Sequence, residues 1–392
     1  MKMVDVEAIL APLVAEIATQ AAIHDQAGTF PHQSYRCLHE AGYLRLVLPV
    51  EYGGAGANLL AMVHGQELLG RADGAVAMAT GMLVQLIGRL AEDRPWPEAV
   101  FAEVCTALAR DGGLINSVVT EPDLGSISRG GTPATHALPV EGGWLVNGHK
   151  IFATGAPVLR FHVTGLTLPP SADAPQGWQA NAIIPANAPG VRSEPTWSEN
   201  LSMRTCGNDD IFYEQVFVPD AWMVDRKRIG APTSPSKRPE MNAWSLVIAA
   251  GYLGVGQAAL DAACDYANTR IPPSLGKPIG ELPHIQQWIG RMAIALGAAR
   301  SVLHEAARRW DQEPAQRADL AAQIAMAKYL CTNAACEASE TAMRVAGGFS
   351  LTRRLPLERY YRDARAGLFH PPQDDLAIGV IARSALAARQ PK

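Results

Sequence analysis

The chain has 392 residues, of which 48% are hydrophobic and 18% are charged. That length exceeds what one hydrophobic core usually holds, so several packed domains are expected. The formal net charge is −4, which gives no basic surface of the kind that binds nucleic acid or an anionic membrane. Composition therefore excludes a disordered or fibrous protein and favours a small molecule as the partner.

Cysteine usage indicates a reducing compartment. No CxxC pair and no nearby histidine cluster is present, which predicts free thiols and no metal site. The stretch Met1–Ile23 carries Asp5, Glu7 and Glu16 within an apolar pattern, unlike a signal or transit peptide. A cytoplasmic protein is expected. The six cysteines are Cys37, Cys105, Cys206, Cys264, Cys331 and Cys336.

The first third of the chain has a helical pattern. From Val4 to about Arg110, apolar residues recur at three- and four-residue spacing. Consecutive glycines and a proline in the stretch 49–56 interrupt this pattern and predict a loop. We therefore expect an N-terminal α-helical domain over residues 1–113.

The middle of the chain changes to strand and turn signals. Short runs rich in Val, Ile, Thr and aromatic residues alternate with Gly, Pro, Asn and Asp, which predicts a mostly antiparallel β domain over residues 114–228. The proline-rich, polar stretch Gly165–Gly177 predicts an exposed hairpin loop. The expected strands are Ile115–Thr120, Gly143–Phe152, Ala180–Ile184 and Ile211–Val218.

The last part of the chain returns to helical periodicity. The proline-rich stretch Ala231–Pro239 predicts a linker, and the Ala- and Leu-rich runs from Met241 onward predict an antiparallel four-helix bundle over residues 229–392. Trp244–Leu260 carries no charge, but it is shorter than the ~20 residues that a bilayer requires. Its glycines instead predict a buried helix that a neighbour approaches closely. The expected fold class is α+β, in the order helical, β, helical.

Several short stretches resemble the signature sequences of acyl-CoA dehydrogenases, in the order of that family. No P-loop and no GxGxxG motif accompanies them. The resemblance spans most of the chain and implies the three-domain fold of that family and an oxidoreductase that uses FAD, with FMN as an alternative. The stretches are 119–126 (VTEPDLGS), 147–155 (NGHKIFATG), Met203-Arg204 ahead of 217–219 (FVP), and 347–365, which begins with GG and ends with RDAR.

The resemblance also implies where the flavin is bound. Hydroxyl groups and glycine backbone suit a cofactor edge, and a guanidinium suits a pyrophosphate. The alternative for the first stretch is a simple turn between strands, and for each arginine a surface ion pair. Contacts within one chain are implied for Val119, Thr120, Gly125, Ser126, Phe152 and Thr154, and contacts across a homodimer or homotetramer interface for Arg270, Arg344, Gly347 and Gly348.

The sequence departs from the family at the catalytic base. In the family a glutamate after the RDAR motif removes a proton from the acyl-CoA, and its backbone N–H binds the thioester oxygen. Ungapped counting places Pro371 there, which has neither a carboxylate nor an N–H. Trp244 occupies the alternative position of the base, and Ser245 that of an arginine that helps to hold acyl-CoA. His370 and Asp374 remain as candidate catalytic residues.

Three functions follow as hypotheses. The first is α,β-dehydrogenation of an acyl thioester, with acyl-CoA as the substrate and His370, Asp374 or Asp375 as the base. The second is a monooxygenase or oxidase that uses reduced flavin and O2, which the missing glutamate and His370 favour. The third is a flavin-binding protein without catalysis. The acyl chain length, the electron acceptor and any flavin reductase stay open.

Overall fold

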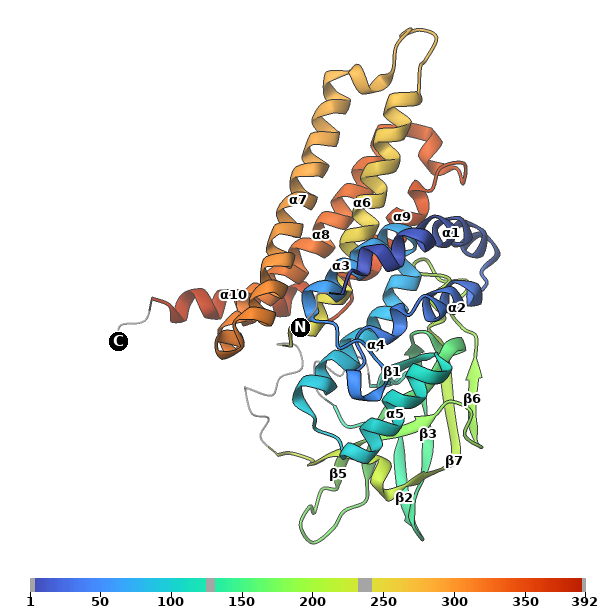
Figure 1. Cartoon of the computed structure of the whole chain (residues 1–392), viewed down its shortest axis with the longest axis vertical. Coiled ribbons are helices and arrows are strands. Elements are labelled where there is room, and N and C mark those ends of the chain that lie inside the picture. Colours follow the sequence, from blue (N-terminus) through green and yellow to red (C-terminus); the bar gives the residue numbers. More distant parts are fainter. Residues whose placement is uncertain (1–3, 125–130, 232–241, 390–392) are drawn as a thin grey trace.

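Five helices form first in the chain, as the apolar spacing predicts. A computed structural model describes residues 4–124, 131–231 and 242–389 (Figure 1), so Gly125, Ser126 and nearly all of the expected linker Ala231–Pro239 lie outside the described residues. Asp5 accepts a hydrogen bond from Ala8 N (3.0 Å) and so caps the first helix. The helices are α1 (Val6–Ala27), α2 (His32–Glu40), α3 (Leu59–Ala72), α4 (Gly74–Asp93) and α5 (Glu98–Asp111).

The middle region forms one mixed sheet. Its strand order is β6-β7-β3-β2-β4-β5-β8, with β1 paired to β4. The β1–β4 and β2–β4 pairs are parallel, and the other pairs within the described residues are antiparallel. The strands are β1 (Leu114–Val118), β2 (His136–Val140), β3 (Gly143–Ala153), β4 (Leu159–Leu168), β5 (Trp178–Pro185), β6 (Val191–Glu194), β7 (Asp209–Pro219) and β8 (Met223–Arg228).

The expected hairpin loop begins later than the sequence predicted. β4 continues through Leu168, and Gly165 pairs with Asn181 while Leu168 pairs with Trp178 of β5. Leu166 and Leu168 are buried, so apolar burial extends the strand into a stretch that its prolines had marked as loop. Only residues 169–177 connect the two strands.

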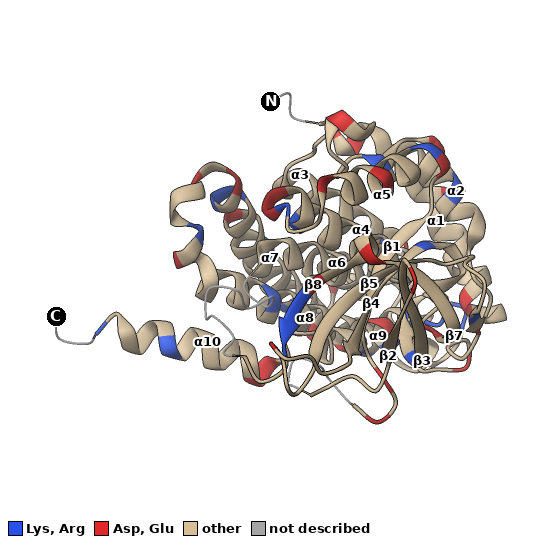
Figure 2. Ribbon diagram, turned by 90° about the horizontal axis from the view of Figure 1, so that it is seen from below, with Lys and Arg blue, Asp and Glu red and all other residues tan. Residues whose placement is uncertain are grey.

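The C-terminal region is a bundle in which α6 lies beside α8, with α7 and α9 completing it (Figure 1). α10 extends away from the body of the molecule, while acidic and basic residues are interspersed over the remaining elements (Figure 2). The helices are α6 (Leu246–Thr269), α7 (Pro283–Gln312), α8 (Ala321–Ala346), α9 (Leu357–Arg365) and α10 (Asp374–Ala387).

Glycines bring α6 into close contact with α3, which confirms the predicted buried helix. A Cβ atom at Gly254 would lie 2.2 Å from Glu67 O, and one at Gly70 would lie 2.1 Å from Gly251 O. Side chains at these positions would force the two helix backbones apart. The N-terminal helices are therefore packed directly against the bundle.

Among the residues that the structure describes, three helices are long and apolar enough to cross a membrane by length and composition alone: α1, α4 and the segment Ala243–Thr269. Their apolar windows differ in burial, at 22%, 78% and 83% respectively. The apolar surfaces of α4 and α6 are thus covered by the protein itself.

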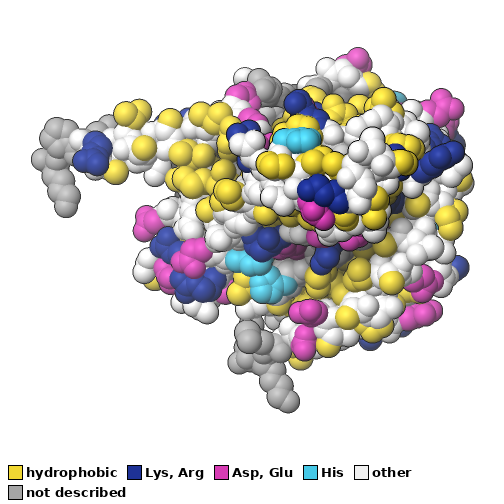
Figure 3. All heavy atoms as spheres, turned by 90° about the horizontal axis from the view of Figure 1, so that it is seen from above, with side chains coloured by type: hydrophobic (Ala, Val, Ile, Leu, Met, Phe, Trp, Pro, Cys, Tyr) yellow, Lys and Arg dark blue, Asp and Glu magenta, His cyan; other side chains and the backbone are white. Residues whose placement is uncertain are grey.

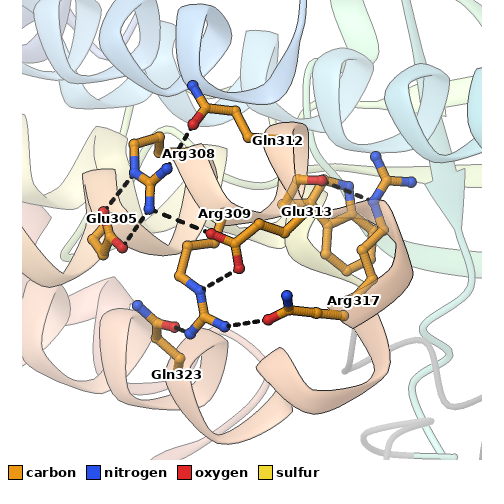
Figure 4. A network of polar contacts seen from close by, with 9 residues as sticks. Glu305, Arg308, Arg309, Gln312, Glu313, Arg317 and Gln323 are labelled. Atoms are coloured by element: carbon orange, nitrogen blue, oxygen red, sulfur yellow. Dashed lines mark hydrogen bonds and ion pairs between the residues drawn. The ribbon is translucent and has the colours of Figure 1, made fainter.

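A polar network fixes the end of α7 (Figure 4). Arg309 binds Glu313 (3.0 Å) and donates to Gln323 of α8 (2.9 Å), and Arg308 binds Glu305 (2.7 Å). Each partly exposed pair contributes little alone. Together they join the end of α7 to the start of α8.

Candidate active site

The structure brings together the two stretches that the resemblance assigned to the flavin ring. Ile151 N donates to Thr120 O (2.9 Å), and Asn116 Nδ2 donates to Thr154 O (3.1 Å). These bonds place the segment that follows β1 beside the end of β3. Val119 and Thr120 therefore lie close to Phe152 and Thr154, although the two stretches are separate in the sequence.

A buried ion pair, which the sequence reasoning missed, holds these two stretches together. Lys150 Nζ lies 2.6 Å from Glu121 Oε1 and 2.7 Å from Gly165 O. The two side chains are 0% and 5% exposed. Glu121 also accepts hydrogen bonds from Ala134 N (2.7 Å) and Thr135 N (3.0 Å). Burial alone would raise the pKa of Glu121, but Lys150 and these donors hold it below its usual value. Burial lowers the pKa of Lys150, and Glu121 opposes that shift.

Next to these stretches lies an exposed apolar ledge, formed by Phe152 and Trp197. Phe152 is 52% exposed. Trp197 meets the Phe152 ring edge-on, with the ring centroids 5.4 Å apart. Phe152 has a φ of 59°, a left-handed conformation that is costly for a residue with a Cβ.

The residues of this ledge and of its borders are of the kinds that a flavin needs. A flat tricyclic ring needs apolar surface for its face, and it needs hydrogen-bonding groups for the oxygen and nitrogen atoms along its edge. The ledge supplies the first, and the hydroxyl groups of Thr120 and Thr154 supply the second. The left-handed backbone at Phe152 accompanies a ring that is half exposed.

The helix with the RDAR sequence, α9, anchors this region to the N-terminal helices. Arg362 Nη2 lies 2.6 Å from Asp25 Oδ2 of α1, and Arg362 Nη1 donates to Leu201 O (3.1 Å). Asp363 is buried and accepts from Met203 N (2.7 Å). Burial raises the pKa of Asp363 to about 7. α9 thus joins α1, the segment 201–203 and the turn that carries His370.

His370 lies on the turn that follows α9. Its backbone N–H donates to Ala366 O (3.1 Å), and its ring meets that of Tyr252 of α6, with centroids 6.3 Å apart. A Cβ at Gly367 would lie 3.0 Å from Thr332 Cγ2 of α8, so this turn is closely packed. The imidazole remains partly exposed, yet burial and then the charge of Lys328 lower its pKa to about 4.

Asp374, the other candidate catalytic residue, is the first residue of α10 and is bound to α8. Asn333 Nδ2 donates to Asp374 Oδ2 (3.0 Å), and Lys328 Nζ lies 3.4 Å from Asp374 Oδ1. Both carboxylate oxygens therefore have partners. Lys328 was not singled out from the sequence, although an isolated lysine in an alanine-rich apolar helix was the available signal.

The position of the alternative base is filled by packing. Trp244 is buried, and a Cβ at Gly88 of α4 would lie 2.2 Å from its indole ring. Ser245 Oγ donates to Asn242 O (2.9 Å). This end of α6 therefore contributes an indole and a bonded hydroxyl group at the two positions where the family has a carboxylate and an arginine.

A second group of predicted cofactor residues lies at the far end of the bundle. The Arg270 guanidinium stacks over the Phe349 ring at 5.2 Å, and Phe349 belongs to the 3₁₀ turn Gly347–Leu351. Cβ atoms at Gly347 and Gly348 would meet nothing within 4 Å. Arg344 binds Glu340 one helical turn away (2.8 Å), as expected for the alternative of a surface ion pair. α6 has 24 residues, or ~36 Å, and its far end lies away from the sheet (Figure 1).

A separate cleft of about 770 Å³ lies between α5 and β4. Its lining includes Asp111, Arg160, Phe161 and Trp222, and none of the predicted site residues. It is therefore distinct from the flavin ledge and from the His370 turn.

The helical domain, the β domain and the helical bundle follow one another in the order of the acyl-CoA dehydrogenase fold. Models of the N-terminal, middle and C-terminal domains of acyl-CoA dehydrogenase match residues 7–93, 116–216 and 240–386. The protein YdbM of Bacillus subtilis (strain 168) is 37% identical over 94% of this chain and 93% of its own length. The chain belongs to the acyl-CoA dehydrogenase family.

Other known proteins are similar to this chain in sequence or in fold. Glutaryl-CoA dehydrogenase of Desulfococcus multivorans is 29% identical over 93% of this chain and 91% of its own length. The crystal structure of TdsC from Paenibacillus sp. A11-2 with FMN and indole has a TM-score of 0.85 at 20% identity, with 98% of both chains covered. A nitrososynthase from Micromonospora carbonacea var. africana has a TM-score of 0.81 at 22% identity, covering 97% of this chain and 95% of its own.

Proposed function

We propose that the protein oxidises an acyl thioester, in the form of an acyl-CoA, across its α and β carbons, with FAD as the cofactor and His370 as the base. Membership of the family supports this reaction class, as does likeness to a relative named for glutaryl-CoA. The base removes the proton from the α carbon, the hydride leaves the β carbon, and a C=C bond forms between them. When bound, the flavin supplies the acceptor for that hydride.

The proposal rests on the protonation state of His370 and on the partners of its neighbours on the same turn. A base must be unprotonated, and the pKa of His370 of about 4 leaves its imidazole neutral at pH 7. Asp374 has both oxygens bound by α8, and Pro371 offers no acid or base. His370 is therefore the group on this turn that is present in its unprotonated form at pH 7, as a weak base.

The ledge and its borders would hold the ring. Phe152 and Trp197 would cover one part of it and exclude water, while the hydroxyl groups of Thr120 and Thr154 would fix its edge. The Lys150–Glu121 ion pair would keep the two stretches that carry these hydroxyl groups side by side. Binding and orientation at this place are the contribution of the β domain to the reaction.

A second copy of the chain would complete the cofactor site. Arg270 and the turn Gly347–Leu351 lie a bundle length from the sheet, so they suit the phosphate and adenine parts of a partner's FAD. The exposed apolar side chains on α7 and α10 support such contact: Ile294 is 73% exposed, Ile378 52% and Leu386 69%. Figure 3 shows hydrophobic side chains along the extended α10. We propose a homodimer or homotetramer in the cytoplasm.

A second candidate function rests on Pro371. Thioester oxidation needs donors for the negative charge that develops on the carbonyl oxygen, and the loss of one donor costs ~2.7–4 kcal/mol. Pro371 lacks the N–H that the family uses. This favours, as the alternative, a monooxygenase or oxidase that takes reduced FAD or FMN and O2, in which the neutral His370 would form hydrogen bonds to reacting oxygen atoms.

Anaerobic titration of the purified yellow protein with acyl-CoAs of increasing chain length tests the proposal. Absorbance near the flavin maximum should be lost with at least one of them. His370→Gln should keep the colour and lose the bleaching, while the matched variant His136→Gln on exposed β2 should behave as the wild type. Oxygen uptake with reduced flavin and a reductase, without anaerobic bleaching, would identify the second candidate. A protein that does neither would contradict both.

A further inference from the structure

The cleft between α5 and β4 lies where the N-terminal helices meet the sheet, and the proposed function makes no use of it. Its volume of about 770 Å³ is typical of ligand sites in proteins, which often lie at such domain boundaries. One wall is a face of α5. The other wall is formed by the start of β4, the end of β5 and Trp222. The cleft is therefore large enough for a small molecule.

The main chain joins the two walls at one end of the cleft. α5 ends at Asp111, and Gly112 and Gly113 lead directly into β1, whose first residue, Leu114, pairs with Leu159 of β4. A Cβ atom at Gly113 would lie 3.1 Å from Val158 O, so glycine lets the chain pass close to β4 here. The spacing of the walls at this end is thus fixed by backbone.

Two guanidinium groups share one carboxylate at the same end. Arg160 Nη2 lies 2.6 Å from Asp111 Oδ2, and Asp111 also accepts hydrogen bonds from Arg110 Nε and Nη2, both at 2.7 Å. Arg160 Nε is hidden from solvent and has no hydrogen-bond partner within the described residues, which is unfavourable for a donor. This end therefore has one positive charge more than its acid balances, and a donor without an acceptor.

The rest of the lining indicates what else a ligand should carry. The rings of Phe161 and Trp222 lie with their centroids 6.0 Å apart and their planes inclined by 42°. Trp222 is only partly buried, so it offers surface to a further aromatic ring. Glu103 lines the cleft two helical turns, or ~10 Å, from Arg110. It has no ion-pair partner in the part of the chain that the structure describes, so its charge disfavours an anion at that end.

We propose that this cleft is a second ligand site, which binds a small aromatic carboxylate. The carboxylate of the ligand binds the Arg160 guanidinium, which Asp111 engages at Nη2 alone. The ring of the ligand lies against Trp222 and Phe161. The site is separate from the flavin ledge and does not rest on the proposed function, because none of its residues takes part in the proposed oxidation.

Isothermal titration calorimetry of the full chain with 3-phenylpropionate tests the proposal. One molecule should bind per chain, with a Kd below about 1 mM. The matched amide, 3-phenylpropanamide, has nearly the same shape but no charge, so it should bind at least about tenfold more weakly. Absence of binding of the acid up to about 10 mM, or equal affinity for the acid and the amide, would overturn the proposal.

Variants on the two walls locate the bound molecule. Arg160→Gln should weaken binding of the acid at least about tenfold, while Arg192→Gln should not, although Arg192 is also partly exposed and paired with a carboxylate, that of Glu194. Thr106 is an exposed residue of α5 that lines the cleft. Thr106→Trp should fill the cleft and abolish binding, whereas Thr19→Trp on exposed α1 should bind as the wild type does.

These variants also separate the cleft from other places where the probe could bind. Wild-type affinity in both Arg160→Gln and Thr106→Trp would show that the probe lies elsewhere on the chain, which would overturn the proposal. Competition between 3-phenylpropionate and added FAD would overturn it as well, because the cleft and the flavin ledge have no residue in common. Since the two substitutions act on opposite walls, either one decides the question if the other variant does not fold.

Discussion

Replacement of Lys150 by methionine should unfold the β domain locally and release the flavin. The ammonium is fully buried and lies 2.6 Å from Glu121 Oε1 and 2.7 Å from Gly165 O. Methionine has a similar length but no charge, so the Glu121 carboxylate would stay buried without its counter-ion. Breaking a buried pair from one side costs about 3–5 kcal/mol.

Urea unfolding, followed by tryptophan fluorescence and by flavin release, measures this cost. Lys227→Met, the same substitution on the exposed edge strand β8, should change the free energy of unfolding by no more than about 0.5 kcal/mol. The double variant Lys150→Met with Glu121→Gln should recover much of the loss, because no buried charge then remains. A double variant as unstable as the sum of both single variants would refute this reasoning.

Three further predictions concern other parts of the molecule. If His370 is the base, kcat/KM should fall about tenfold per pH unit below about pH 4, and a profile flat through that range would exclude it. Gly254→Ala should destabilise by about 1–3 kcal/mol, since its Cβ would lie 2.2 Å from a backbone oxygen of α3, whereas Gly297→Ala on α7, with open space around it, should stabilise by about 0.5–1 kcal/mol; denaturation midpoints check both. The pKa of Asp363 of about 7 lies above its unfolded value of about 4, so its contribution to the free energy of unfolding should be lost as pH rises from 4 through 7, and Asp363→Asn should remove that slope.

The local spacing of apolar residues predicted the order of helical and β regions along the chain. The change from helical spacing to short β-branched runs near Leu114, and the return near Met241, are properties of neighbouring residues, which periodicity reports directly. The buried α6 was predicted for the same reason, because its glycines have few other uses in a helix interior. The start of the hairpin loop at Gly165 was wrong, since pairing with β5 extended the strand.

The site was predicted only in part, because much of it depends on tertiary contact. Lys150 lies on β3 and Glu121 in the segment after β1, and the residues around each of them do not indicate that the two side chains form a pair. Lys328 is paired with Asp374, which the fold brings to it from another helix. The resemblance supplied Thr120, Phe152 and Thr154 as neighbours, but the left-handed backbone of Phe152 and the supporting Trp197 became visible only in three dimensions.

The most direct test is the flavin content of the purified chain, because the proposed function requires a flavin at the ledge that Phe152 and Trp197 form. Equilibrium titration with FAD and FMN, oxidised and then reduced under anaerobic conditions, should reach one flavin per chain for the wild type and for Thr19→Val on exposed α1. Thr154→Val should bind at least about tenfold more weakly, consistent with the loss of one hydrogen bond in a dry site. Absence of binding by the folded wild-type chain in all four titrations, or equal affinity in Thr154→Val, would contradict the proposed site.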